Sequence, residues 1–130
     1  LKTFIIFKIL LLNGSLEQNG TLILDEPEVH LHPEWQKILA EIIVLIQIEF
    51  GMHILINSHS AFFIEAIETY EMQYDIRNKC NFYLAQENAN TKTSIFKDVS
   101  DDLQPIYSLL YMPLKKLMAE QRTQNDACKP

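Results

Sequence analysis

The sequence contains little glycine, little cysteine and no long apolar run, and each shortage excludes a class of protein. Of its 130 residues, three are glycine and two are cysteine. Cys80 and Cys128 form no CxxC pair, so they provide neither a disulfide framework nor zinc-finger spacing, and we expect reduced thiols. The apolar stretches are shorter than the roughly 18 residues that a membrane-spanning helix needs. We therefore expect a cytoplasmic protein that makes no use of a membrane.

Basic residues are also scarce. Eleven Lys and Arg against 17 Asp and Glu give a formal net charge of -6 and a sequence pI of about 5.1. Proteins that bind nucleic acid usually carry a basic stripe, so nucleic acid is not expected to bind through this segment. A hydrophobic share of 48% and a charged share of 22% are ordinary for a folded chain that forms one domain or a piece of one.

Two short apolar segments, 21–25 and 53–57, predict neighbouring parallel strands joined by a helix. The first is apolar on both faces, which is typical of a central strand in a parallel sheet. Pro33 fits the first turn of the connecting helix and Gly51 fits its end near residue 50. Strand, helix and strand in this order predict a right-handed crossover and an α/β fold.

Two further helices complete the predicted core, which spans residues 1–70. Residues 1–12 are expected to form a largely buried helix that stops at Asn13 and Gly14. Ser60 is expected to cap a helix after the second strand, with Phe63 as its third residue.

Residues 71–118 predict a C-terminal extension of a different kind. Apolar segments at 81–86 and 93–97, joined by a polar stretch, indicate a hairpin. Two short helices are expected on either side of Pro113, because proline breaks a helix interior. The polar residues 119–130 are expected to fray.

An acidic pair follows the first strand, where ligands of open α/β sheets bind. Asp25 and Glu26 repel each other unless a cation offsets their charge. Mg²⁺ prefers carboxylate and phosphate oxygens, so Asp25 is placed to hold it, through water. Side chains alternate along an extended chain, so Glu26 points elsewhere. It can then orient and deprotonate a water that attacks a terminal phosphate.

A histidine follows the second strand. If the two strands are neighbours, His59 lies near the acidic pair and its imidazole can donate a hydrogen bond to a phosphate oxygen. An acidic pair alone can be a solvated turn with a helix cap. Both strand ends together favour a phosphoryl-transfer site.

These motifs carry a family resemblance. TLILDEPEVHLHPEWQ resembles the extended Walker B and D-loop region of ABC-type ATPases, and HILINSHSAFF resembles their switch-histidine strand. DEPEVHLHP is similar to the branch that contains the overcoming-lysogenization-defect nucleases and the ATPases of Septu and some retron antiphage systems. The tail LQPIYSLLYMPLKKL loosely resembles the Septu-type ATPase. His32 departs from transport-type members, which have aspartate there. The resemblance covers residues 21–65 well.

The resemblance implies roles for individual residues. Asp25 matches the magnesium-associated aspartate, Glu26 the catalytic glutamate and His59 the switch histidine that contacts the γ-phosphate. ATP and Mg²⁺ are the implied cofactors. The D-loop, which faces a partner subunit in this superfamily, matches Val29, His30, Leu31 and His32. The implied assembly is a homodimer that sandwiches ATP, in antiphage defence, with a possible separate nuclease subunit.

One motif of that superfamily is missing. No G-x-x-x-x-G-K-S/T occurs, so the chain cannot hold the α- and β-phosphates by the usual loop and lysine. Asn13, Gly14 and Ser15 lie too near Asp25 to replace the signature segment, which is expected before Leu1. We therefore expect residues 1–130 to be the C-terminal part of one P-loop NTPase domain of the ABC type. The full-length protein is expected to be an ATPase and this segment alone to be inactive.

Four other interpretations remain open from the residues. His30 and His32, on one side of an extended chain with Glu26 and Glu28, could bind zinc. The acidic pair could serve a two-metal nuclease if further carboxylates converged on it. The chain could be a catalytically incomplete module that only dimerises or docks a partner. It could also belong to the ATPase subunit of a transporter.

Overall fold

The computed structural model describes residues 2–88 and 91–127, and for residues 123–127 it describes the backbone alone. The chain divides after Asn78 into two compact units, which are considered separately. The fold of the first unit positions the candidate site.

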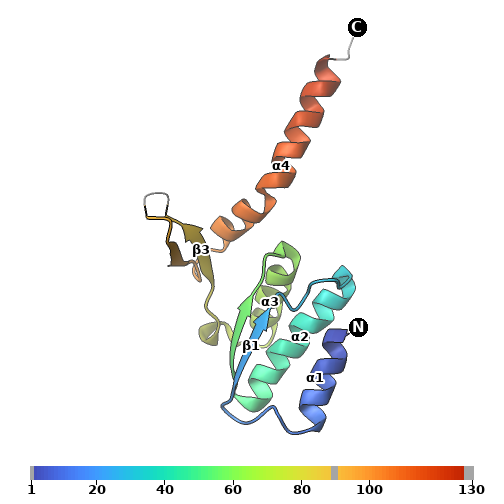
Figure 1. The fold of residues 1–130 in the computed structure, drawn as a ribbon, viewed down its shortest axis with the longest axis vertical. Coiled ribbons are helices and arrows are strands. Elements are labelled where there is room, and N and C mark those ends of the chain that lie inside the picture. Colours follow the sequence, from blue (N-terminus) through green and yellow to red (C-terminus); the bar gives the residue numbers. More distant parts are fainter. Residues whose placement is uncertain (1, 89–90, 128–130) are drawn as a thin grey trace. The chain divides into compact units, whose positions relative to one another are not determined.

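The first unit is built on two parallel strands, as the sequence predicted. β1 (Thr21–Asp25) pairs with β2 (His53–Asn57) in a register that sets Thr21 opposite His53 and Asp25 opposite Asn57. Figure 1 shows the strands side by side next to the helices α2 (Pro33–Phe50) and α3 (Ala61–Gln73). The strands, their adjacency and the connecting helix are all confirmed.

Local signals fix both ends of α2. Pro33 occupies its first turn, where its missing N–H costs no hydrogen bond. Gly51 ends the helix in the left-handed region at φ 61°, and its N–H donates to the Gln47 carbonyl at 2.8 Å. β2 begins two residues later, so this end determines where the strand starts. For α3, the Ser60 side chain accepts from the Phe63 N–H at 3.2 Å, as predicted.

The core of this unit lies between α2 and α3. Buried apolar side chains from both helices form it: Leu39, Ala40, Ile43, Val44 and Ile46 from α2, and Phe63, Ala66 and Tyr70 from α3. The Tyr74 hydroxyl donates to Glu41 Oε1 at 2.7 Å and ties the end of α3 to α2. That hydrogen bond raises the pKa of Tyr74 above its usual value.

The sheet is covered on one face, whereas the sequence predicted a strand buried on both. Burial alternates along β1 and β2. Leu22, Leu24, Ile54 and Ile56 are half-buried, but Ile23 and Leu55 on the opposite face are 69% and 62% exposed. Within the described part of the chain each of these strands has a single neighbour. An apolar run therefore marked a strand correctly without marking two buried faces.

The first helix, α1 (Lys2–Leu12), is also less buried than predicted. Its one buried residue is Phe7, whereas Ile5, Ile6 and Leu12 are 51%, 56% and 77% exposed. Apolar residues lie all around this helix, and only one side of it meets the rest of the unit. The stop at Gly14, at φ 71°, is confirmed.

The second unit contains the predicted hairpin, with strands β3 (Tyr83–Glu87) and β4 (Ser94–Asp98) paired antiparallel. A single helix, α4 (Gln104–Ala127), replaces the two short helices expected around Pro113. Pro113 cannot donate to the Leu109 carbonyl four residues earlier, but Leu109 is exposed, so water can satisfy that carbonyl.

The same helix corrects the expectation for the tail. Residues 119–127 are helical instead of frayed, and residues 128–130, with Cys128, lie outside the described residues. Asp102 begins the helix by accepting from the Gln104 N–H at 2.9 Å. Across the described ranges, none of the helices combines the length and apolarity needed to cross a bilayer.

Replacing Gly51 by alanine should lower the free energy of unfolding by about 1 kcal/mol, because a Cβ is strained in the left-handed region. The added Cβ would also lie 3.2 Å from Asn19 Oδ1. Gly51→Asn should lose less, since asparagine tolerates this conformation better. Urea denaturation followed by circular dichroism measures both variants. An alanine variant as stable as the parent would contradict this account of the helix end.

Candidate active site

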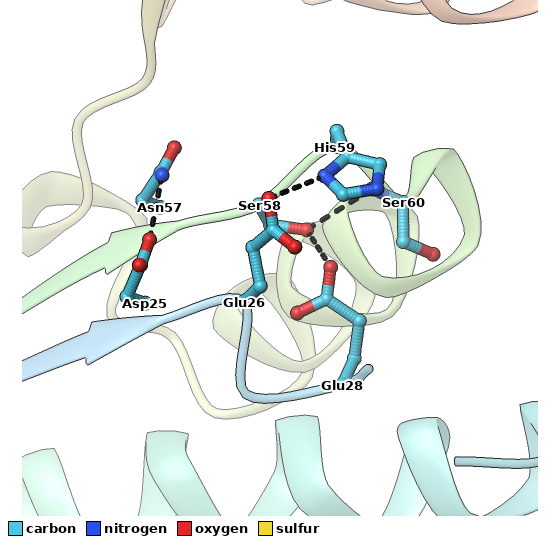
Figure 2. Close-up of polar contacts among 7 residues, drawn as sticks. All are labelled: Asp25, Glu26, Glu28, Asn57, Ser58, His59 and Ser60. Carbon is cyan, nitrogen blue, oxygen red and sulfur yellow. Dashed lines mark hydrogen bonds and ion pairs between the residues drawn. The ribbon is translucent and has the colours of Figure 1, made fainter. Parts of the chain in front are cut away.

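The candidate site lies where the carboxyl ends of β1 and β2 meet (Figure 2). The register sets Asp25 directly opposite Asn57, and Asn57 Nδ2 donates to Asp25 Oδ1 at 2.8 Å. Both side chains are exposed and lie on the open face of the sheet with Ile23 and Leu55. The amide therefore fixes one carboxylate oxygen of Asp25 and leaves the group accessible.

Glu26 leaves the line of the strand because its backbone is left-handed, at φ 44°. Its N–H still donates to the Asn57 carbonyl at 2.8 Å, which extends the sheet by one hydrogen bond. Its own carbonyl accepts from the Val29 N–H at 3.1 Å and closes a turn. A left-handed residue other than glycine costs about 1–3 kcal/mol, and such strain clusters at functional sites. The divergence of Glu26 from Asp25 thus comes from this turn in addition to strand alternation.

The structure brings Glu26 and His59 together. His59 Nδ1 lies 2.8 Å from Glu26 Oε1, and the two side chains are 70% and 39% exposed. A carboxylate accepts, so the ring donates from Nδ1 and its other nitrogen is free to meet a ligand. An exposed pair of this kind adds little to the stability of the fold.

Beneath this pair lies a set of polar side chains that the sequence reasoning gave no catalytic role. Glu28 is 3% exposed, and its Oε1 accepts a short hydrogen bond from the Ser58 hydroxyl. Ser58 Oγ also accepts from the Ser60 N–H at 3.1 Å. The Ser60 hydroxyl donates to Gln36 Oε1 on α2 at 3.0 Å. These bonds join the loop after β1, the loop after β2 and both helices.

Sequence reasoning missed Asn57, Ser58 and Gln36, and weighed Glu28 only as a zinc ligand. The position of Asn57 was readable once the strands were aligned, since it occupies the place of Asp25 on the next strand. No sequence signal indicated that Glu28 is buried, because an acidic residue after a strand is ordinarily exposed.

The four residues expected to form the D-loop make a turn that leads into α2. Val29 and His30 are exposed, and the Leu31 N–H donates to the Glu28 carbonyl at 3.0 Å. His32 caps α2, with Nδ1 accepting from the Glu34 N–H at 3.4 Å.

The extended chain assumed for the zinc interpretation was wrong. His30 is left-handed at φ 66°, so the alternation that would place it beside His32 is broken. Among the residues that the structure describes, no group of three or more His, Cys, Asp or Glu side chains is arranged to hold a metal ion.

A magnesium ion held through water fits the chemistry of Asp25. The carboxylate is exposed at the end of a strand, it is oriented by Asn57, and the half-buried carboxylate of Glu26 follows it. A hard cation with its own water ligands would offset this concentration of negative charge.

Comparison with known families gives a match over the segment that carries the candidate site. Residues 4–65 match the family described as “AAA domain, putative AbiEii toxin, Type IV TA system”. That range contains Asp25, Glu26 and His59 and supports a P-loop NTPase of the AAA type. It also supports nucleotide binding and an ATPase-type function, which usually uses Mg²⁺. No curated protein and no solved structure matches the chain.

The left-handed backbone of Glu26 can be tested with two variants that both remove the carboxylate. Glu26→Gly should be more stable to urea than Glu26→Ala, by about 1 kcal/mol, because only alanine pays the steric cost of φ 44°. Glycine has more conformational freedom than alanine in the unfolded chain, which acts against this effect. The expected difference in unfolding free energy therefore lies between about zero and about 1 kcal/mol in favour of Glu26→Gly. If Glu26→Ala is the more stable variant, the turn is not strained as described.

Proposed function

We propose that this chain is the C-terminal part of an ABC-type ATPase domain and that Glu26 is the base that activates water for ATP hydrolysis. The supporting observation is the 2.8 Å contact between Glu26 and His59 at the ends of adjacent parallel strands. It joins a proton acceptor and a hydrogen-bond donor at the edge where α/β sheets bind ligands.

In this proposal Glu26 Oε2 orients the attacking water and takes its proton as the oxygen bonds to the terminal phosphorus. His59, held at Nδ1 by Glu26, presents its other nitrogen to a terminal phosphate oxygen, and donates there when the ring is doubly protonated. Asp25, oriented by Asn57, would hold Mg²⁺ through water. Bound magnesium supplies charge neutralisation for the phosphates.

We propose further that the turn from Val29 to His32 meets a second copy of the domain when ATP is bound. Val29 and His30 are exposed, so a partner can reach them. His30 directs this turn through its left-handed backbone, and the turn begins three residues after the candidate base. A partner seated there would therefore sense the state of the catalytic loop.

The biological role that we propose is antiphage defence, in the branch with the overcoming-lysogenization-defect nucleases and the Septu ATPases. The motif DEPEVHLHPEWQ supports it. The net charge of -6 favours a partner or another segment, instead of this one, as the surface that meets nucleic acid. A separate nuclease would then be the effector.

The matched family provides a second candidate, because its description names a toxin of a toxin–antitoxin system. Neighbouring genes distinguish the two roles. An adjacent HNH-type nuclease would favour the defence ATPase, and an adjacent small antitoxin gene would favour the toxin. An adjacent membrane permease would contradict both and indicate a transporter.

Glu26→Gln in the full-length protein should keep ATP binding and lower kcat by roughly 100- to 10,000-fold, because the amide keeps the shape but cannot take a proton. Phosphate release measures turnover, and a fluorescent ATP analogue measures binding. Glu49→Gln, an exposed carboxylate at the far end of α2, is the matched control and should retain parental turnover. Turnover within about twofold of the parent would show that Glu26 is not the base.

ATP should also drive pairing of the full-length protein. With Glu26→Gln, which is expected to trap bound ATP, light scattering should report a doubled mass when ATP and Mg²⁺ are added. His30→Glu should reduce this shift, because two like charges would meet in a symmetric contact. An unchanged mass with saturating ATP would argue against the dimer and would leave the hydrolysis proposal to the preceding test.

A further inference from the structure

We propose that Glu28 is a positioning residue, which acts through Ser58 to hold the loop after β2 so that His59 meets Glu26. The proposal rests on the proposed function, since it concerns the geometry of the same site. Glu28 is buried, whereas Glu26 and His59 are accessible to solvent. In this proposal Glu28 therefore does not touch ATP or the attacking water.

The first observation is the burial of Glu28. A carboxyl side chain that is 3% exposed is exceptional, because removal of an acidic group from water is costly unless hydrogen bonds replace the water. Oε1 has Ser58 as its partner, whereas Oε2 is buried without a hydrogen bond among the described residues. An apolar side chain would pack there at lower cost, so stability alone does not account for Glu28.

The second observation is where Ser58 and Ser60 lie, on either side of His59. Ser58 donates to Glu28 and accepts from the Ser60 N–H at 3.1 Å. Ser60 caps α3 and donates to Gln36 at 3.0 Å. The backbone that carries His59 is therefore tied down on both sides, to the loop after β1 and to the two helices.

The third observation is that His59 is not fixed by its own contacts. Its side chain is 70% exposed, and its ion pair with Glu26 is exposed as well. The attraction within such an exposed pair is too weak to offset the entropy lost when two side chains are held in one geometry. The 2.8 Å geometry of this pair therefore depends on the loop. The Glu26 N–H already joins the two segments at the Asn57 carbonyl, and the bond from Ser58 to Glu28 joins them again at the residue next to His59.

The spectroscopic consequence is a defined tautomer for His59. Because Nδ1 donates to a carboxylate, the neutral ring should carry its proton on Nδ1. Nitrogen-15 NMR of the imidazoles reports this form in the 130-residue chain without nucleotide, and loss of the signal in His59→Gln assigns it. This readout does not depend on hydrolysis.

Ser58→Ala is the central variant, with Ser58→Thr as the conservative rescue and Ser108→Ala, an exposed serine on α4, as the matched control. Ser58→Ala should lose the Nδ1–H signature, and in the full-length protein it should lower kcat roughly 10- to 100-fold, with the KM for ATP within about threefold. Ser58→Thr should restore both readouts, because it retains the hydroxyl. Ser108→Ala should leave both unchanged.

Glu28→Met removes the acceptor at similar volume and provides a second, independent variant that should fold. It should reproduce the loss seen in Ser58→Ala, and the double variant should be no worse than either single one, because the two residues act as one unit. Additive losses, a retained Nδ1–H signature, or equal effects of Ser58→Thr and Ser58→Ala would overturn the proposal. If Glu26→Gln stays active while these variants lose the signature, the proposed hydrolysis fails and the positioning role stands.

Discussion

The parallel pairing of β1 with β2 is the interaction on which the candidate site depends. Parallel strands bring their carboxyl ends to the same edge, so the register that sets Asp25 opposite Asn57 also brings Glu26 and His59 within 2.8 Å. A shift of one residue would reverse every side chain of β2 and separate the pair. The crossover helix α2 determines that register, because its end at Gly51 leads into β2 after one residue, Met52. Met52 is buried and anchors the entry.

Two costs concentrate on the loop that follows β1. Glu26 has a left-handed backbone, and Glu28 is a buried carboxyl with one oxygen that has no hydrogen bond within the described part of the chain. Either feature alone destabilises the fold by an amount on the order of 1–3 kcal/mol. A loop that only connected β1 to α2 would need neither. Both destabilising features lie within three residues of each other and next to His59, as is typical of a functional site. The apolar core between α2 and α3 offsets their cost in folding free energy.

Sequence reasoning located the elements of the first unit because each had a local signal. Pro33, Gly51 and Ser60 mark helix ends through backbone and capping chemistry that depends on few neighbours. The same local logic failed at Pro113, where solvent around α4 tolerates a missing hydrogen bond that a buried helix would not. Burial was predicted poorly for α1 and for the open sheet face, since burial depends on which segments pack against an element.

The candidate site shows the same division. Asp25, Glu26 and His59 could be named from their positions at strand ends, because topology alone determines where strand ends meet. The partnership between Glu28 and Ser58 could not be predicted, because it depends on the left-handed turn at Glu26, which directs the chain back beneath the site. Residue type gave no hint of a non-glycine residue with positive φ.

The candidate site has residues on both faces of the sheet, one exposed to solvent and one packed toward α2 and α3. Asp25 and Asn57 belong to the exposed face, with Ile23 and Leu55, so a group that approaches this face meets the acidic side chain first. Glu28, which is buried, and Ser58 and Ser60, which are half-buried, lie toward α2 and α3, where their hydrogen bonds are partly shielded from water. In the proposed function, a metal ion and phosphates must reach the exposed face, whereas the groups that orient His59 must be shielded from water. The pairing of β1 with β2 provides an exposed face and a shielded face because side chains alternate between the two faces of a sheet. The left-handed Glu26 lies where the chain passes from the exposed face to the shielded one.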